Sequence, residues 1–364
     1  MVAFPLTVTG SRMNSPRITR RHVIGRALAM LGAGIAATAF SVSALAQAPT
    51  KVRFTLDWRY EGQLSMFMLA KTKGYFEKEG LDVSVDVGAG SGATVNRIVS
   101  GSHDAGTADM STVIEFLGNN PGATRLQAVY LLYNRSTLVI MTLKKSGINM
   151  PQDLAGKKIA APVFDSVRKA FPIYARAIGI DPKTVTFLNI DPAIRETLVI
   201  RGEADATTGF ELNRLTLIQR GAKDEDINMF RYTDAGLNLY GNAVLVSSKM
   251  INENPKAVSG LVRAINLAML DTIANPEEAI RANKVFDRLI DEKTELDKLR
   301  ITLRAIDTDY SRSNGLGSLN KLVLDNQVDD VAAAFNLKTK PSADFIFNSS
   351  FLPPKSERIP RGGK

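Results

Sequence analysis

The chain has 364 residues, of which 45% are hydrophobic and 23% are charged, a composition typical of globular proteins at a length that allows two domains. It contains no cysteine and only two histidines, which excludes disulfides, thiolate metal sites and cysteine nucleophiles and nearly excludes a histidine-based triad. The formal net charge is +9, but residues 1–46 hold five arginines and no acidic residue, which leaves 41 basic and 37 acidic residues elsewhere. Without a basic stripe, nucleic acid is not an expected partner.

The first 46 residues have the order of an export signal. The twin-arginine pair Arg20-Arg21 precedes an uncharged run rich in Ala and Gly, residues 27–46, and Ala44-Leu45-Ala46 has the small-x-small form that a signal peptidase needs. The run is almost long enough to be a permanent membrane anchor, but its weak apolar character favours cleavage. We therefore expect a twin-arginine signal peptide over residues 1–46 and export to the periplasm, with Met13 as an alternative start.

The first half of the remaining chain alternates between strand and helix patterns. In Leu81–Val87, apolar residues alternate with Asp and Ser, which is typical of a half-buried strand. Strands are expected over Lys51–Leu56, Leu81–Val87 and Asp104–Thr107, and helices over Gly62–Lys78 and Thr94–Ser100. This βαβ order predicts a parallel sheet covered by helices.

The second half repeats this order. Strands are expected over Lys157–Ala161, Val185–Asn189 and Asp205–Thr208, and helices over Ser166–Ile178 and Ala193–Arg201. Val99–Thr107 and Ile200–Thr208 also share Gly, Asp, Ala and Thr at a constant offset. The repeated order and this echo predict two similar lobes.

The apolar runs between and after the two halves indicate how the lobes are connected. Leu126–Tyr133 and Thr137–Leu143 lie between the halves, Asn242–Ser247 follows the second half, and residues 255–306 have a helical pattern. We expect lobe 1 to comprise residues 47–138 and 243–364 and lobe 2 residues 139–242. Two crossovers, near residues 139 and 243, would then form a hinge. Phe345, Phe347 and Phe351 in the tail are expected to dock on a lobe.

Six loops follow the expected strands, and ligands of open parallel sheets bind beyond the carboxyl ends of the strands. These loops are Asp57–Gln63, Gly88–Ala93, Ala108–Ser111, Pro162–Ser166, Asp191–Pro192 and Gly209–Asn213. If the lobes face one another, all six open into one cleft.

The glycine-rich loop Gly88–Ala93 follows a strand and begins a helix, so free backbone N–H groups would face an anion or a polar ligand group. We expect Gly90, Ser91, Gly92 and Ala93 to contact ligand. The loop also matches a dinucleotide fingerprint, with Asp109 at roughly the distance of the ribose-binding acid, and a purely structural turn is the third interpretation.

Trp58, the only tryptophan of the chain, lies in the first of these loops. Its ring would support a ligand ring, and Asp57 would accept a hydrogen bond from a ligand amine or hydroxyl. Packing between the lobes explains the tryptophan equally well. Arg59 and Tyr60 are weaker candidates in the same loop.

Further polar residues at strand ends have two interpretations. Asp109 precedes a helix and would serve either as its N-cap or as a ligand contact. The same ambiguity holds for Asp165 and Ser166, of which Ser166 is in the predicted ligand-binding set. Phe210 and Glu211 occupy the mirror position in lobe 2. Phe164 and Asn242 complete the predicted ligand-binding set. We expect no catalytic residue and no metal site, although Asp57, Asp109 and Glu211 would converge if the protein carried out paired-carboxylate chemistry.

Several of these stretches occur together in one known family. They are Leu56-Asp57-Trp58, Lys73–Val83, Gly88–Gly92, Ser100-Gly101 with Asp104, Asp153–Lys157 and Tyr240-Gly241-Asn242. In them the chain resembles the periplasmic solute-binding proteins of ABC importers, in the nitrate/sulfonate/taurine and thiamine-pyrimidine group. The resemblance implies an α/β type II periplasmic-binding-protein fold, capture of a small polar solute without a cofactor, and delivery to a membrane permease with a separate ATPase. It also implies ligand contacts from the loops Asp57–Tyr60 and Ser91–Ala93, and we expect a monomer.

The same group includes an enzyme, the eukaryotic thiamine pyrimidine synthase, which the chain resembles through its Leu-Asp-Trp and Gly-Tyr-Phe segments. That enzyme depends on a Cys-rich segment, an active-site histidine and a lysine that carries pyridoxal phosphate. Here cysteine is absent, and Arg59–Gln63 stands where the Asn- and His-bearing stretch would be. Binding without catalysis is therefore expected, with a pyrimidine-like or amine-bearing solute favoured over sulfonates and nitrate, and the enzyme is the alternative.

Overall fold

A computed structural model describes residues 9–10, 48–122 and 126–360 of the chain. The chain divides into two units, Met1–Ala48 and Pro49–Lys364, and all that follows concerns the second. The expected signal peptide lies outside the described residues apart from positions 9 and 10.

Five strands form a first sheet in the order β2-β1-β3-β10-β4. They are β1 (Thr50–Thr55), β2 (Leu81–Asp86), β3 (Ala105–Asp109), β4 (Leu126–Leu131) and β10 (Asn242–Ser247). Strands β1, β2 and β3 are parallel, but β10 runs antiparallel to β3 and β4. The expectation of a parallel sheet is therefore corrected to a mixed one, because β10 enters from the other lobe rather than through a helical crossover.

A second sheet has the order β7-β6-β8-β5-β9. Its strands are β5 (Leu138–Leu143), β6 (Lys158–Ala161), β7 (Thr186–Asn189), β8 (Ala206–Phe210) and β9 (Ile227–Arg231). Here too three strands are parallel, and β5 is antiparallel to its neighbours β8 and β9. Strands β6, β7 and β8 hold the places that β1, β2 and β3 hold in the first sheet, so the two echoing segments end in equivalent third strands.

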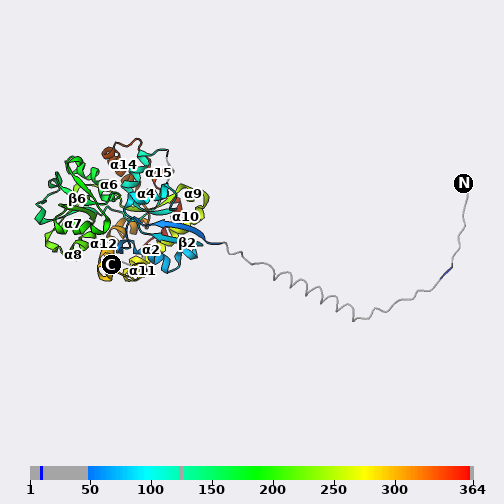
Figure 1. The fold of residues 1–364 in the computed structure, drawn as a ribbon. Coiled ribbons are helices and arrows are strands. Elements are labelled where there is room, and N and C mark those ends of the chain that lie inside the picture. The colour runs from blue at the N-terminus through cyan, green and yellow to red at the C-terminus, as the bar shows by residue number, and fades with distance from the viewer. Residues whose placement is uncertain (1–8, 11–47, 123–125, 361–364) are drawn as a thin grey trace. The chain divides into compact units, whose positions relative to one another are not determined.

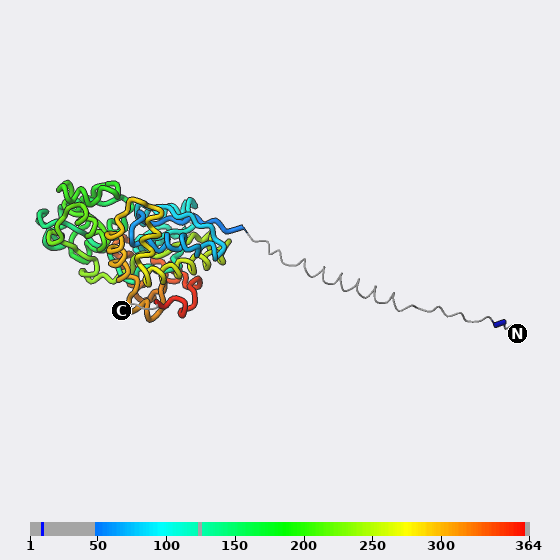
Figure 2. Tube along the Cα trace, turned by 90° about the horizontal axis from the view of Figure 1, so that it is seen from below, coloured from blue at the N-terminus to red at the C-terminus, as the bar shows by residue number. Residues whose placement is uncertain are grey.

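The chain crosses between the sheets twice, from β4 to β5 and from β9 to β10. We call the part built on the first sheet lobe 1 and the part built on the second sheet lobe 2. Figure 1 shows β6, α7 and α8 of lobe 2 on one side and β2, α2, α10 and α11 of lobe 1 on the other. Figure 2 shows the green chain of lobe 2 gathered at one end of the same unit.

Helices cover both sheets. Lobe 1 carries α2 (Ser65–Thr72), α3 (Tyr75–Lys78), α4 (Ser91–Val99), α5 (Met110–Asn119), α9 (Ser248–Glu253), α10 (Pro255–Ala274), α11 (Pro276–Phe286), α12 (Glu292–Ile306), α13 (Asp309–Asn314), α14 (Lys321–Phe335) and α15 (Ala343–Ile346). Lobe 2 carries α6 (Ser166–Ala177), α7 (Arg195–Arg201) and α8 (Asn213–Gln219). The helix expected over Gly62–Lys78 is interrupted after Thr72, because Gly74 adopts a left-handed φ of 67°.

Short 3-10 helices fill the connections: Gly62–Leu64, Lys144–Ser146, Pro151–Leu154, Pro182–Thr184, Pro192–Ile194, Asp224–Asp226, Thr233–Ala235, Ser349–Phe351 and Lys355–Glu357. Among the described residues, one helix, α10, is long and apolar enough to cross a membrane, but 61% of its most apolar 18-residue stretch is buried inside the protein. Its buried residues belong to the lobe 1 core, as expected of a core helix.

One hydrophobic cluster joins the two lobes. It contains Val113 of α5, Phe171 of α6 and Val328 of α14, so lobe 2 packs on lobe 1 through these helices. The expected docking of the tail is seen at Phe347, which is buried in this cluster and bridges to Ala128 of β4.

Candidate ligand-binding site

A small pocket lies between the lobes, with a cavity volume of about 20 Å³, which is room for about one water molecule, so a ligand ring enters only when the lobes separate. Both lobes contribute to its walls. The lining residues are Asp57, Trp58, Gln63, Gly90 and Ser91 from lobe 1 and Asp165, Ser166, Arg195, Gly209, Phe210 and Asn213 from lobe 2. Six of the fourteen predicted ligand-binding residues are in this set: Asp57, Trp58, Gly90, Ser91, Ser166 and Phe210.

Asp57 follows β1 and is 4% exposed. Thr107 donates its hydroxyl to Asp57 Oδ1 at 2.7 Å, and Asn242 donates its amide to Oδ2 at 2.6 Å. Burial raises the pKa of Asp57 to about 6, against the opposing effect of these hydrogen bonds. The pocket therefore contains a carboxyl held by neutral donors, which changes charge near neutral pH.

Trp58 also follows β1, and its ring packs against the lobe 1 core. The guanidinium of Arg195, from the first turn of α7 in lobe 2, lies over this ring with Cζ 5.0 Å from the ring centroid. Such a cation–π contact stabilises by about 0.5–2 kcal/mol, depending on its desolvation. Trp58 thus packs between the lobes, as one interpretation of the sequence predicted, and also lines the pocket.

Arg195 is held by two carboxylates of its own lobe. Its Nε and Nη2 donate to Glu196 Oε1 at 3.0 and 2.6 Å, and its Nη1 donates to Asp165 Oδ2 at 3.4 Å. Asp165 is also the N-cap of α6, because it accepts a hydrogen bond from the backbone N–H of Arg168 at 2.8 Å. Burial raises the pKa of Asp165, and the charge of Arg195 opposes that shift.

Several side chains of the pocket wall present acceptors to a ligand. Gln63 Oε1 is buried and has no hydrogen-bond partner among the described residues. Asn213 Oδ1 already accepts from the backbone N–H of Phe210 at 2.8 Å. Together with the carboxylates of Asp57 and Asp165, this arrangement suits a ligand that donates hydrogen bonds.

The glycine-rich loop is closed by hydrogen bonds within the protein. The N–H groups of Gly88 and Gly90 donate to the carbonyls of Trp58 and Asp57, and the N–H of Gly92 donates to the Phe164 carbonyl of lobe 2 at 3.1 Å. The N–H groups of Gly88, Gly90 and Gly92 are therefore occupied, whereas the N–H of Ser91 at the start of α4 has no partner among the described residues, so an anion contact at Ser91 stays a prediction. The glycines of this loop serve close approach, since a Cβ on Gly90 would lie 2.2 Å from the Phe164 carbonyl oxygen.

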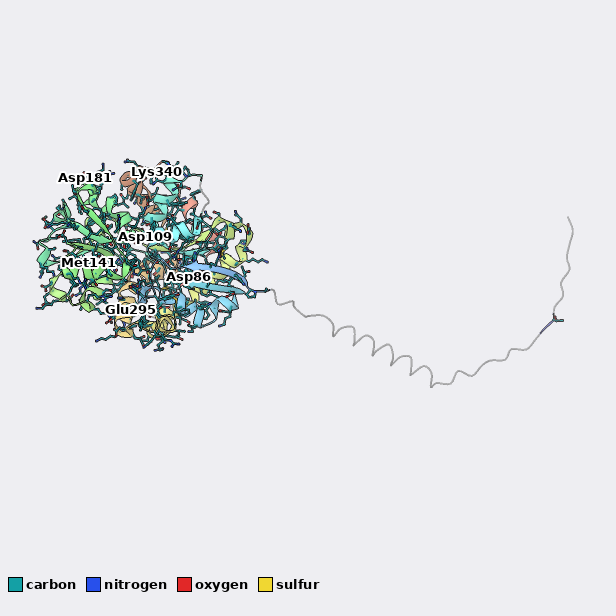
Figure 3. All side chains as sticks on the ribbon, viewed as in Figure 1. Asp86, Asp109, Met141, Asp181, Glu295 and Lys340 are labelled. Atoms are coloured by element: carbon teal, nitrogen blue, oxygen red, sulfur yellow. The ribbon has the colours of Figure 1, made fainter. Side chains whose placement is uncertain are left out.

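Asp109 lies behind the pocket wall. It is fully buried, caps α5 by accepting from the Ser111 N–H at 2.9 Å, and donates its own N–H to Ser91 Oγ at 3.0 Å. Burial raises its pKa to about 7, to which the nearby charge of Asp57 adds. Figure 3 shows Asp109 near the middle of the folded unit. Of its two interpretations, the structure shows the cap.

The other predicted residues lie around the pocket rather than in its wall. Asn242 donates a hydrogen bond to Asp57 and is not itself in the lining. Tyr60 donates its hydroxyl to the Val85 carbonyl at 2.9 Å, and Glu211 pairs with Arg135 at 3.2 Å and with Arg231 at 3.6 Å.

Three further predicted residues, Arg59, Gly92 and Ala93, are also absent from the lining, and Arg59 is exposed. Phe164 is 40% exposed, with its side chain against Gly92. Arg59 and Phe164 are exposed, and Gly92 and Ala93 directly follow the lining residue Ser91 in α4.

Five lining residues were absent from the predicted set: Gln63, Asp165, Arg195, Gly209 and Asn213. Gln63, Gly209 and Asn213 lie at the ends of loops that the strand-end rule had selected. Arg195 lies just beyond the loop Asp191–Pro192, and its neighbour Glu196 was the available signal, since a buried arginine needs an adjacent carboxylate.

The pocket does not fit a lysine-bound pyridoxal phosphate. None of its described lining residues is a lysine or a histidine. Lys298 of α12 is buried but paired with Glu295 at 2.8 Å and near Glu61 at 3.6 Å. The described part of the chain also contains no group of three or more acidic or histidine side chains placed to hold a metal ion.

Comparison with known proteins identifies the family. A family model described as NMT1/THI5 like matches residues 62–279. The chain belongs to this family. The match includes Gln63, the glycine-rich loop and all the lobe 2 residues that line the pocket, so the family resemblance seen in the sequence is confirmed.

Relatives of this NMT1/THI5-like protein include both an enzyme and a binding protein. It is 25% identical over 251 residues to the 4-amino-5-hydroxymethyl-2-methylpyrimidine phosphate synthase of Schizosaccharomyces pombe, covering 65% of this chain and 70% of that one. It is 24% identical over 311 residues to the riboflavin-binding protein RibY of Chloroflexus aurantiacus, covering 84% and 87%.

Among solved structures, the alkanesulfonate-binding protein SsuA of Xanthomonas axonopodis pv. citri, bound to MOPS, superimposes with a TM-score of 0.65 at 17% identity. The match covers 82% of this chain and 99% of that one. The expected periplasmic-binding-protein fold is thereby confirmed.

Proposed function

We propose that this NMT1/THI5-like protein binds a small, flat, donor-rich solute between its lobes and delivers it to an ABC permease driven by a separate ATPase. The observation that carries the proposal is a pocket with walls from both lobes, in which the carboxylates of Asp57 and Asp165 and the unpartnered Gln63 Oε1 face the same space. The fold shared with the alkanesulfonate-binding protein and the similarity to RibY support a solute-binding role.

The pocket favours hydrogen-bond donors over anions in the solute. Among the described lining residues, the cation is Arg195, whose charge is already neutralised by ion pairs with Glu196 and Asp165. Asp57 adds a carboxyl that is held by neutral donors. An anion would be repelled by these acids, whereas ring amines and hydroxyls would find acceptors. A pyrimidine-like or amine-bearing solute meets these conditions.

Mass spectrometry of the solute released from purified protein tests this function. We expect one retained, donor-rich heterocyclic compound, unchanged after prolonged incubation with the protein. A compound that the protein converts into a product would favour the enzyme alternative, for which the similarity to the pyrimidine phosphate synthase is the supporting observation. A retained sulfonate or nitrate would contradict the proposed solute class.

Export belongs to the same proposal. From the twin-arginine order of the sequence, we infer export to the periplasm and cleavage after Ala46. We propose that the exported protein is a monomer. N-terminal sequencing of the periplasmic protein should begin at Gln47. A protein that begins near Met13, or that remains in the cytoplasm, would contradict this part of the proposal.

A further inference from the structure

The contact between Trp58 and Arg195 joins the two walls of the pocket. The indole belongs to lobe 1 and packs against the lobe 1 core, and the guanidinium belongs to lobe 2, 5.0 Å from the ring centroid. Arg195 therefore covers the ring surface on which a ligand ring would stack, and a ligand that stacks there must enter between the two groups.

The hydrogen bonds of Arg195 determine which part of the guanidinium a ligand would meet. Nε, Nη1 and Nη2 all donate to Glu196 or Asp165, and an arginine that recognises an anion uses these same N–H groups. Three of its five N–H groups are thus engaged within lobe 2, and its Cζ lies over the Trp58 ring. A guanidinium face stacks on planar rings.

We propose that Trp58 and Arg195 are the two walls of a slot for a planar ring, and that the face of Arg195 makes the site select flat heterocycles over sulfonates. This inference rests on the proposed function and assigns a specificity-determining role to Arg195. Asp57 and Gln63 Oε1 then accept hydrogen bonds from the edge of the ring.

Insertion of a ring requires the lobes to separate slightly. Stacked groups lie ~3.5 Å apart, so two walls with a ring between them need about 7 Å. The present 5.0 Å must therefore widen by about 2 Å. This movement breaks the Gly92–Phe164 backbone hydrogen bond between the lobes. It breaks no ion pair of Arg195, because Asp165 and Glu196 move with it in lobe 2.

The test uses two probes of different shape on the mature protein: 4-amino-5-hydroxymethyl-2-methylpyrimidine, which is planar, and MOPS, which is a sulfonate. Binding is followed by calorimetry and by the fluorescence of Trp58, the only tryptophan of the chain. We expect the parent to bind the pyrimidine more tightly. Arg195→Lys keeps the charge but removes the flat face, and should weaken pyrimidine binding about tenfold while changing MOPS binding less than twofold.

A second variant tests the engaged N–H groups. Glu196→Gln exchanges the carboxylate that Arg195 binds for a weaker, neutral acceptor, and should strengthen MOPS binding severalfold with little change for the pyrimidine. The matched control is Arg168→Lys, because Arg168 lies over Phe187 at the same 5.0 Å and is not among the lining residues. It should leave both affinities unchanged within twofold.

Three outcomes would overturn the slot. They are an Arg195→Lys protein that binds the pyrimidine as the parent does, equal losses for pyrimidine and MOPS, and a parent that prefers MOPS. Each of these leaves solute binding itself intact. A parent that retains no solute and binds neither probe would instead refute the proposed function, and the slot with it.

Discussion

The two pocket walls have the same topology but different electrostatics. Strands β1 and β6 are each second in the order of their sheet. Asp57 lies just after β1, and Asp165 lies in the loop after β6. Asp57 is held by the neutral donors Thr107 and Asn242, whereas Asp165 is paired with Arg195. Equivalent places in a repeated fold thus hold one carboxyl that titrates near neutrality and one that is kept in an ion pair.

This difference suggests a division of roles between the lobes. The lobe 2 wall is a pre-assembled charge cluster, in which each side chain fixes the next. The lobe 1 wall contributes the Asp57 carboxyl and the Trp58 ring to the ligand. The variants below test this division, from the largest expected effect to the smallest.

Removing Arg195 should be the most damaging change. Arg195→Ala leaves Asp165 and Glu196 buried without their cation, which typically costs about 3–5 kcal/mol of unfolding free energy. Urea denaturation measures the loss, and Arg168→Ala serves as the control for loss of a more exposed arginine. A cost below about 1 kcal/mol would show that the lobe 2 charges are solvated and that the comparison between the walls is wrong.

Asp109 should make the protein less stable as the pH rises. Its folded pKa of about 7 lies above the usual value of 3.8, so its contribution is full below about pH 4 and is lost as the pH rises through 7. Asp109→Asn keeps an N-cap without the charge and should be more stable than the parent at pH 8 by on the order of 1–3 kcal/mol.

At pH 5 the difference between Asp109→Asn and the parent should be much smaller. Urea unfolding at both pH values measures the two differences. A variant that is less stable than the parent at pH 8 would refute the buried-charge argument for this residue.

Trp58→Ala should weaken binding of the identified solute at least tenfold, because both the stacking surface and the wall opposite Arg195 are lost. Calorimetry measures the affinity, and thermal unfolding checks that the variant folds. Parent-like binding by a folded variant would place the ligand elsewhere.

Asp57→Asn should weaken the same affinity about tenfold at pH 8 and change its pH dependence. Because the pKa of Asp57 is about 6, its ionised acceptor form accumulates as the pH rises through 6, so parent affinity should increase over that range. The asparagine variant should show a flat profile. An unchanged profile would assign the titration to another group.

Gly90→Ala should have the smallest effect on affinity and a specific effect on lobe closure. Gly90 has a φ of 124°, and a Cβ there would lie 2.2 Å from the Phe164 carbonyl oxygen across the lobe interface. Small-angle scattering should show a larger radius than that of the parent at saturating solute. Gly101→Ala is the matched control, since Gly101 has a φ of 76° with open space around it. Equal radii for parent and variant would exclude Gly90 as a closure contact.

Local patterns were sufficient to predict most of the fold. The alternation in β2 and the repeated strand–helix order predicted two α/β lobes, because burial on one face imposes a period that the sequence itself carries. The strand-end rule also selected the loops of Asp57, Trp58 and Phe210, since parallel strands place their carboxyl ends at one edge.

Only the tertiary structure decided which strand-end residues meet and how they are charged. Asp109 and Asp165 both precede helices, but one cap is enclosed behind the wall and the other faces the pocket. The pairing of Arg195 with Trp58 joins positions 137 residues apart on different lobes. The N–H groups of Gly88, Gly90 and Gly92 were likewise free by local pattern and are occupied in the fold. Such contacts depend on how the two lobes pack against each other, which no local periodicity encodes.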